Sequence, residues 1–133
     1  MQINKTVGDS TWSAPLAVTT EPVAANSPAL AACATTQLRN GSTTLLIRLY
    51  YGSVSGSIRE MGWDVVYGQP SNASWINWYT FPQSDANTGV ACGAYQNTTS
   101  GNSYINVFLR NATKNVVRQW YWNYGTNDGW QLG

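Results

Sequence analysis

Two stretches of the chain decide its fold: residues 46–64 read LIRLYYGSVSGSIREMGWD, and residues 104–123 read YINVFLRNATKNVVRQWYWN. In each stretch, a run rich in Ile, Leu, Val and Tyr is followed by a polar turn and a second run, which is the pattern of a β-hairpin. The two hairpins align at an offset of 58 or 59 residues, so Arg48 corresponds to Asn106 and Glu60 to Gln119. The chain therefore contains a duplicated unit.

The duplication extends beyond the two hairpins. Residues 25–33 correspond to 86–92, and Trp75 corresponds to Trp130. Each unit consists of four short apolar segments, separated by Gly, Asn, Ser and Pro and without the apolar spacing of a helix. The expected strands span 30–36, 45–51, 57–64 and 74–80 in the first unit, and 89–95, 103–109, 115–122 and 129–132 in the second. Four-stranded antiparallel sheets repeated at this spacing are typical of β-propeller blades.

This pattern predicts one all-β domain over residues 1–133, with a first blade at 28–82 and a second at 86–133. Residues 8–22 resemble the last strand of a preceding blade. Two blades cannot close a ring, so we expect self-association, with three chains completing six blades. The alternatives are a different assembly, an N-terminal strand exchanged between chains, or a fragment of a longer protein.

The composition is rich in large aromatic residues and poor in charge. Seven Trp and eight Tyr stand against two Phe and no His, and such rings favour half-buried, functional positions. Only 10% of the residues are charged and the net charge is +1, which argues against a nucleic-acid partner. No apolar run is long enough to insert into a membrane as a helix.

Localisation stays open on the sequence. Residues 1–5 lack the apolar stretch of a signal peptide, which leaves a cytosolic chain, export without such a signal, or an excised piece. An excess of glycosylation sequons weakly favours a secreted protein. The five sequons are at Asn4, Asn40, Asn72, Asn97 and Asn111.

The two cysteines, Cys33 and Cys92, allow one disulfide at most. Both lie in matching strand-like segments of the two units. Free Cys behaves as a small apolar side chain and is usually buried. We therefore expect two buried free thiols, with a disulfide as the alternative.

Arg48 and Glu60 are the candidate binding pair, because a turn at Gly56 brings their two strands together. If the pair only serves the fold, Arg48 extends to solvent or forms a surface ion pair of little energetic value. As a binding pair, Arg offers a fork of donors and Glu offers two acceptor oxygens. With a Trp face beside them, they match the hydroxyl edges and C–H faces of a carbohydrate.

Four motifs resemble those of the fungal fucose-specific lectins and of their bacterial relatives with two blades per chain, which assemble as trimers. The motifs are Ile47-Arg48-Leu49-Tyr50-Tyr51, Ile58-Arg59-Glu60, Trp63-Asp64 and the closing Gly129-Trp130-Gln131-Leu132-Gly133. The resemblance covers about residues 28–133. It implies one fucose site between two blades, in which Arg48 and Glu60 bind the sugar oxygens and Trp122 and Trp130 of the next blade supply apolar surface.

The second unit departs from this family pattern. Asn106 and Gln119 replace the Arg and the Glu, so both charged groups are lost. The corresponding degenerate second site would use Trp63 and Trp75 of a neighbouring chain. We expect this site to be weak or empty for fucose.

An enzyme and a protein-interaction propeller are the alternative functions. Glycoside hydrolysis needs two flanking carboxyl groups, and only Glu60 lies in the predicted site, because Asp64 is expected in a turn. The chain has no His and no cluster of metal ligands in its sequence, so we expect no catalytic residue, metal or cofactor. The expected partners are fucosylated glycans. A half-exposed Arg48 further predicts that Arg48→Ala abolishes binding and leaves the fold intact.

Overall fold

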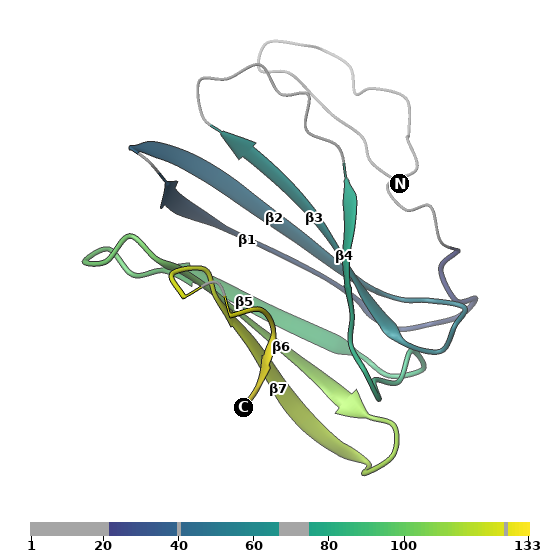
Figure 1. Cartoon of the computed structure of the whole chain (residues 1–133). Coiled ribbons are helices and arrows are strands. Elements are labelled where there is room, and N and C mark those ends of the chain that lie inside the picture. Colours follow the sequence, from purple (N-terminus) through teal and green to yellow (C-terminus); the bar gives the residue numbers. More distant parts are fainter. Residues whose placement is uncertain (1–21, 40, 67–74, 127) are drawn as a thin grey trace, which may run out of the picture.

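The computed structural model describes residues 22–39, 41–66, 75–126 and 128–133. These residues form eight β-strands and no helix, arranged as two four-stranded antiparallel sheets (Figure 1). The first sheet contains, in order, β1 (Leu30–Arg39), β2 (Ser42–Gly52), β3 (Ile58–Val66) and β4 (Ile76–Thr80). The second sheet contains β5 (Val90–Gln96), β6 (Ser103–Asn111), β7 (Val116–Asn123) and β8 (Gln131–Leu132). The prediction of an all-β chain with two units of four strands is confirmed.

The strands differ from expectation mainly at the first hairpin. Strand β1 continues to Arg39 and strand β2 begins at Ser42, and these two residues pair with each other. Gly41, directly before Ser42, has a φ of 77°, a conformation that glycine adopts without steric cost. The predicted N-terminal strand at 8–22 lies, apart from Pro22, outside the described residues. Since the described ranges contain no helix, none of them supplies a helix that could cross a membrane.

The strand register agrees with the sequence duplication in the middle of each sheet. Glu60 pairs with Tyr50 between β2 and β3, and Gln119 pairs with Phe108 between β6 and β7. The duplicated positions thus occupy equivalent places in the two sheets. Side chains alternate between the two faces of a strand, so equivalent residues also share a face.

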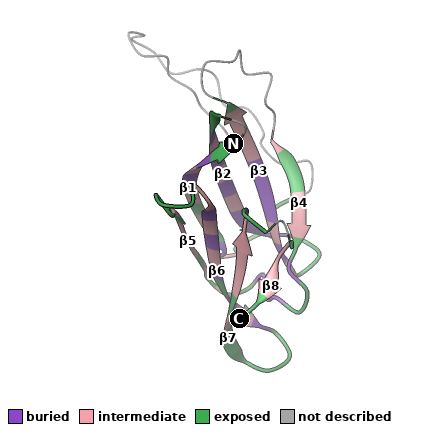
Figure 2. Ribbon diagram, turned by 60° about the vertical axis from the view of Figure 1, so that its left-hand side comes forward, coloured by how far each residue is buried: buried purple, intermediate pink, exposed green. Residues whose placement is uncertain are grey.

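The core lies between the two sheets. The buried face of the first sheet meets a face of the second that carries alternate residues of β6, all buried, as Figure 2 shows along β2, β3 and β6. The cluster at the centre of this layer consists of Ala29, Leu46, Tyr50, Ile58, Phe81, Ile105, Val107, Leu109 and Tyr124. Full burial of a large apolar side chain such as Leu, Ile, Val or Phe contributes roughly 1.5–3 kcal/mol to the stability of the fold.

A disulfide joins the sheets at the edge formed by β1 and β5. It connects Cys33 to Cys92 with a Cα–Cα distance of 6.0 Å, so the expectation of two free thiols is wrong. The reason lies in the register. Cys33 pairs with Arg48, but it is Gly93 that pairs with the equivalent Asn106. Relative to the duplicated strands, Cys92 is therefore shifted by one residue from the position of Cys33. A shift of one residue reverses the face to which a side chain points, so Cys33 points from the first sheet toward the second and Cys92 points from the second toward the first.

Candidate functional site

Arg48 is fully buried in the layer between the two sheets, with 0% of its side chain exposed. It projects from the middle of β2, where its partner across the β2–β3 pair is Gly62. A Cβ on Gly62 would lie 3.0 Å from Arg48 Nη1 and 3.0 Å from the Trp78 ring, so the glycine leaves room for the guanidinium. The expectation of a half-exposed Arg48 is wrong, because the second sheet covers this face of the first.

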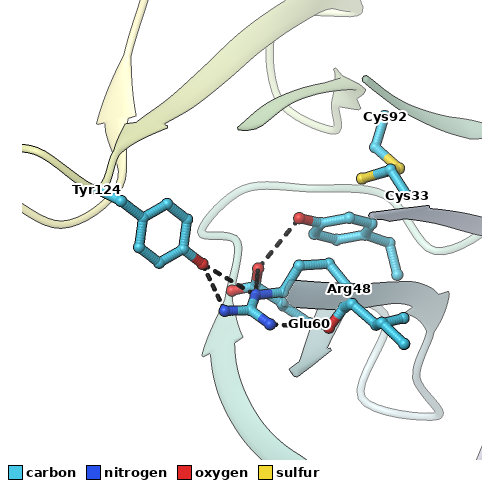
Figure 3. The surroundings of a disulfide bond; sticks show 7 residues. Cys33, Arg48, Glu60, Cys92 and Tyr124 are labelled. Carbon is cyan, nitrogen blue, oxygen red and sulfur yellow. Dashed lines mark hydrogen bonds and ion pairs between the residues drawn. A yellow bond between two sulfur atoms is a disulfide. The ribbon is translucent and has the colours of Figure 1, made fainter. Parts of the chain in front are cut away.

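The guanidinium of Arg48 forms hydrogen bonds from all three of its nitrogen atoms and packs against one aromatic ring. Nη1 donates to the carbonyl oxygen of Ile47 at 2.8 Å and to Asp64 Oδ1 at 2.6 Å. Nε and Nη2 both donate to the hydroxyl of Tyr124, at 3.0 and 2.5 Å. The Trp78 ring covers one face of the group, with Arg48 Cζ 3.9 Å from the ring centroid. Figure 3 shows Tyr124 reaching from the second sheet onto Arg48.

Glu60 joins both sheets at the same place. Its Oε1 lies 3.7 Å from Arg48 Nε and accepts a hydrogen bond from the Tyr50 hydroxyl at 3.1 Å. Its Oε2 accepts a hydrogen bond from Trp130 Nε1 at 2.9 Å. Only 1% of Glu60 is exposed. The carboxylate is therefore the direct polar link between β3 and the segment before β8.

Trp122 completes the set of four predicted site residues. Its ring lies 5.7 Å from that of Trp130, at an interplanar angle of 87°, and 5.4 Å from that of Tyr124, stacked at 21°. Trp122 Nε1 is buried and has no hydrogen-bond partner among the described residues. The structure thus brings Arg48, Glu60, Trp122 and Trp130 together, and we call this set the inter-sheet site.

The inter-sheet site and the adjacent Asp64 together contain one cation and two carboxylates. Burial raises the pKa of Glu60 to about 7 from an ordinary 4.5, and the charge of Asp64 adds to this rise. The hydrogen bond from Trp130, the charge of Arg48 and the hydrogen bond from Tyr50 oppose it. Desolvation lowers the pKa of Arg48, but Tyr124, Asp64 and Glu60 outweigh it and leave that pKa raised. Burial is therefore the main reason why the pKa of Glu60 lies near neutral pH, and the charge of Asp64 is a smaller one.

The residues of the degenerate second site lie on the outward faces of the sheets. Gln119 Nε2 donates to Asn106 Oδ1 at 2.8 Å on the second sheet, and the rings of Trp63 and Trp75 are 5.7 Å apart on the first. Tyr121 occupies the position equivalent to Gly62. Within one chain, the amide pair and the tryptophan pair face away from each other, so they do not form a common site.

Three residues that contact Arg48 beside the inter-sheet site were not among the predicted site residues. Asp64 was assigned to a turn, but it lies inside β3 and binds Arg48. Trp78 and Tyr124 were not singled out, because neither corresponds to an aromatic residue in the other unit. A search for aromatic residues that break the repeat would have found both.

The inter-sheet site offers polar groups for binding and no arrangement for metal chemistry. The Arg donors and the Glu oxygens can address hydroxyl groups, and the Trp rings supply flat apolar faces. Within the ranges that the structure describes, no three His, Cys, Asp or Glu side chains gather where they could hold a metal ion. Comparisons with protein-family profiles, with curated proteins and with solved structures found no match to the chain.

Proposed function

We propose that this chain is a carbohydrate-binding protein that recognises L-fucose-containing glycans at the inter-sheet site. One observation carries the proposal. Four residues singled out by their resemblance to fucose-specific lectins form a chain of contacts across the two sheets, from Arg48 through Glu60 and Trp130 to Trp122. Arg48 and Glu60 approach to 3.7 Å, and Trp130 reaches Glu60 from the second sheet at 2.9 Å.

The chemistry of the site fits a neutral polyol. Arg48 and Glu60 are shielded from water, and charge-assisted hydrogen bonds to hydroxyl groups are stronger in such surroundings. Trp122 and Trp130 are partly exposed, so they stand at the margin of the site where a sugar would enter. Their rings suit the C–H face and methyl group of fucose.

The outward faces of the sheets support a propeller assembly. Phe108, 43% exposed on the second sheet, corresponds to Tyr50, which is fully buried against the other sheet. In the same way, the partly exposed Ile47 on the outward face of the first sheet corresponds to Ile105, which is fully buried. Each outward face thus repeats the pattern of an inner face, so a second copy stacked head to tail would cover it. Three copies joined in this way give a ring of six blades.

In such a ring, the degenerate second site would form between copies. Asn106 and Gln119 of one copy would face Trp63 and Trp75 of the next. The amide pair carries no charge, and we assign the fucose-binding activity to the inter-sheet site alone. The assembly would present one working site per chain on a common surface, which strengthens binding to a glycan-coated target.

Calorimetric titration with methyl α-L-fucoside, with galactose as the control sugar, tests this function. Saturable binding at about one sugar per chain is expected, and Glu60→Gln should weaken it because the charged acceptor is lost. Asp85→Asn is the matched control, since Asp85 lies in the link between the sheets and bonds Arg110 instead. Two sugars per chain would assign activity to the degenerate second site as well. The absence of heat from folded protein would contradict the fucose assignment and favour another glycan or a protein partner.

A further inference from the structure

The hydroxyl of Tyr124 fills the donor fork of Arg48. Arginine carries five N–H donors, of which Nε–H and one Nη2–H point in parallel toward a single partner. Both of these donors bond the Tyr124 hydroxyl, at 3.0 and 2.5 Å. The part of Arg48 that best recognises an oxygen atom is therefore occupied by the protein's own Tyr124 hydroxyl.

The rest of the guanidinium offers no second fork. Both Nη1 donors are used, one by Asp64 and one by the carbonyl oxygen of Ile47. Trp78 covers one face of the group. A ligand oxygen can therefore reach the paired donors of Arg48 only where the Tyr124 hydroxyl now lies.

Tyr124 also occupies the stacking surface of the site. Its ring lies against Trp122 at a centroid distance of 5.4 Å and an interplanar angle of 21°. A flat apolar face on Trp122 and a hydroxyl in the fork of Arg48 are the two contacts expected of a bound sugar. Tyr124 makes both at once.

We propose that Tyr124 is an internal competitor of the ligand, and that its displacement sets the affinity and the hydroxyl selectivity of the inter-sheet site. This inference rests on the proposed function. A sugar must offer a hydroxyl for Arg48 together with a C–H face for Trp122, because a ligand with only one of these does not replace what Tyr124 supplies.

The backbone of Tyr124 is fixed, so displacement is a rotation of its side chain. Its N–H donates to the Ser103 carbonyl oxygen at 3.0 Å, and its own carbonyl oxygen accepts from Gln37 Nε2 at 3.4 Å. The residue lies directly after the end of β7, in the turn at 124–126. The strand register can thus persist while the ring swings away from Arg48.

The test compares the affinity of methyl α-L-fucoside for the wild-type chain, Tyr124→Phe and Tyr79→Phe by calorimetry. Tyr124→Phe keeps the ring but leaves two buried Arg48 donors unpaired until the sugar arrives, so we expect about tenfold tighter binding, the scale of one hydrogen bond to a charged group. Tyr79→Phe removes a hydroxyl from a ring that packs beside Trp130 and should bind like the wild type.

Unchanged or weaker binding by Tyr124→Phe, with wild-type binding intact, would overturn the inference and leave the proposed function standing. If none of the three proteins binds the sugar while folded, both fall together. A crystal structure of the wild-type chain with the sugar gives a second measure should Tyr124→Phe fold poorly. Displacement of the Tyr124 hydroxyl from Arg48 by a sugar oxygen supports the inference, and retention of that bond contradicts it.

Discussion

The guanidinium of Arg48 occupies the space that a side chain at Gly62 would need, because a Cβ on Gly62 would lie 3.0 Å from Arg48 Nη1. The same pair of positions in the second sheet holds Tyr121 and Asn106, where the large side chain stands on the opposite strand. Loss of the Arg at 106 is therefore accompanied by gain of a ring at 121, which donates from its hydroxyl to Gln131 Oε1 at 2.6 Å. The second unit therefore differs from the first by an added aromatic side chain at this place as well as by the missing charge.

Gly62→Ala should displace Arg48 from its network. Overpacking of a filled interior costs about 1–3 kcal/mol, and the free energy of unfolding in urea should fall by this amount. Gly93→Ala is the matched control, because a Cβ at that strand position meets no atom within 4 Å. Equal stability of the two variants would show that the guanidinium is not confined by Gly62.

Arg48→Ala should destabilise the fold as well as abolish sugar binding, in contrast to the expectation from the sequence. It leaves Glu60 and Asp64 beside an empty space without their cation, and removing one partner of a buried ion pair costs about 3–5 kcal/mol. The comparison is Arg110→Ala, whose pair with Asp85 is 40% exposed on the arginine side and should contribute less than about 1 kcal/mol. Chemical denaturation measures both, and similar losses would contradict the buried network.

Glu60 should make the chain less stable as the pH rises toward neutrality. Below about pH 4.5, Glu60 is protonated in the folded and the unfolded chain alike. Between that value and the folded pKa of about 7, only the unfolded chain loses the proton, so stability falls, by up to about 3 kcal/mol. Glu60→Gln removes this dependence. The difference in unfolding free energy between wild type and variant should thus change between pH 4 and 8, and a constant difference would place the pKa of Glu60 at its ordinary value.

Reduction of the Cys33–Cys92 bond should lower the stability of the chain by about 4 kcal/mol, the loop-closure entropy of a link across 59 residues. The double variant Cys33→Ser and Cys92→Ser should behave like the reduced wild type and should not respond to a reducing agent. Thermal unfolding with and without reductant measures the effect. Two titratable thiols in the folded, unreduced protein would contradict the disulfide.

The strands and their duplication could be predicted from the sequence because both follow from local alternation and from internal similarity. The burial of Arg48 could not be, since it depends on how one sheet covers the other. The disulfide escaped prediction for a related reason. Cys33 and Cys92 align in sequence, but the register places Gly93 at the equivalent position, and only that one-residue shift turns the two thiols toward each other.

The inter-sheet site shows the same division. Resemblance to the motifs of fucose-specific lectins was enough to group four residues, because each has the residue type and the place in the motif that the resemblance implies. They are Arg48, Glu60, Trp122 and Trp130. Tyr124 has no counterpart in the first unit, where Val65 stands at the corresponding place. Its role arises from contact across the layer between the sheets, about which the order of residues carries no direct information.

The disulfide also determines how the chain would carry mechanical tension. A pull on the two ends passes across the Cys33–Cys92 bond, so residues 34–91 are bypassed and bear no force. Arg48 and Glu60 lie inside this shielded loop, whereas Tyr124 lies outside it. Stretching a single molecule should therefore separate the second sheet from the first while the strands of the shielded loop stay folded. Tension would open the inter-sheet site by moving the second sheet, while Arg48 and Glu60 keep their places in the first. A measured extension long enough to include residues 34–91 would contradict this expectation.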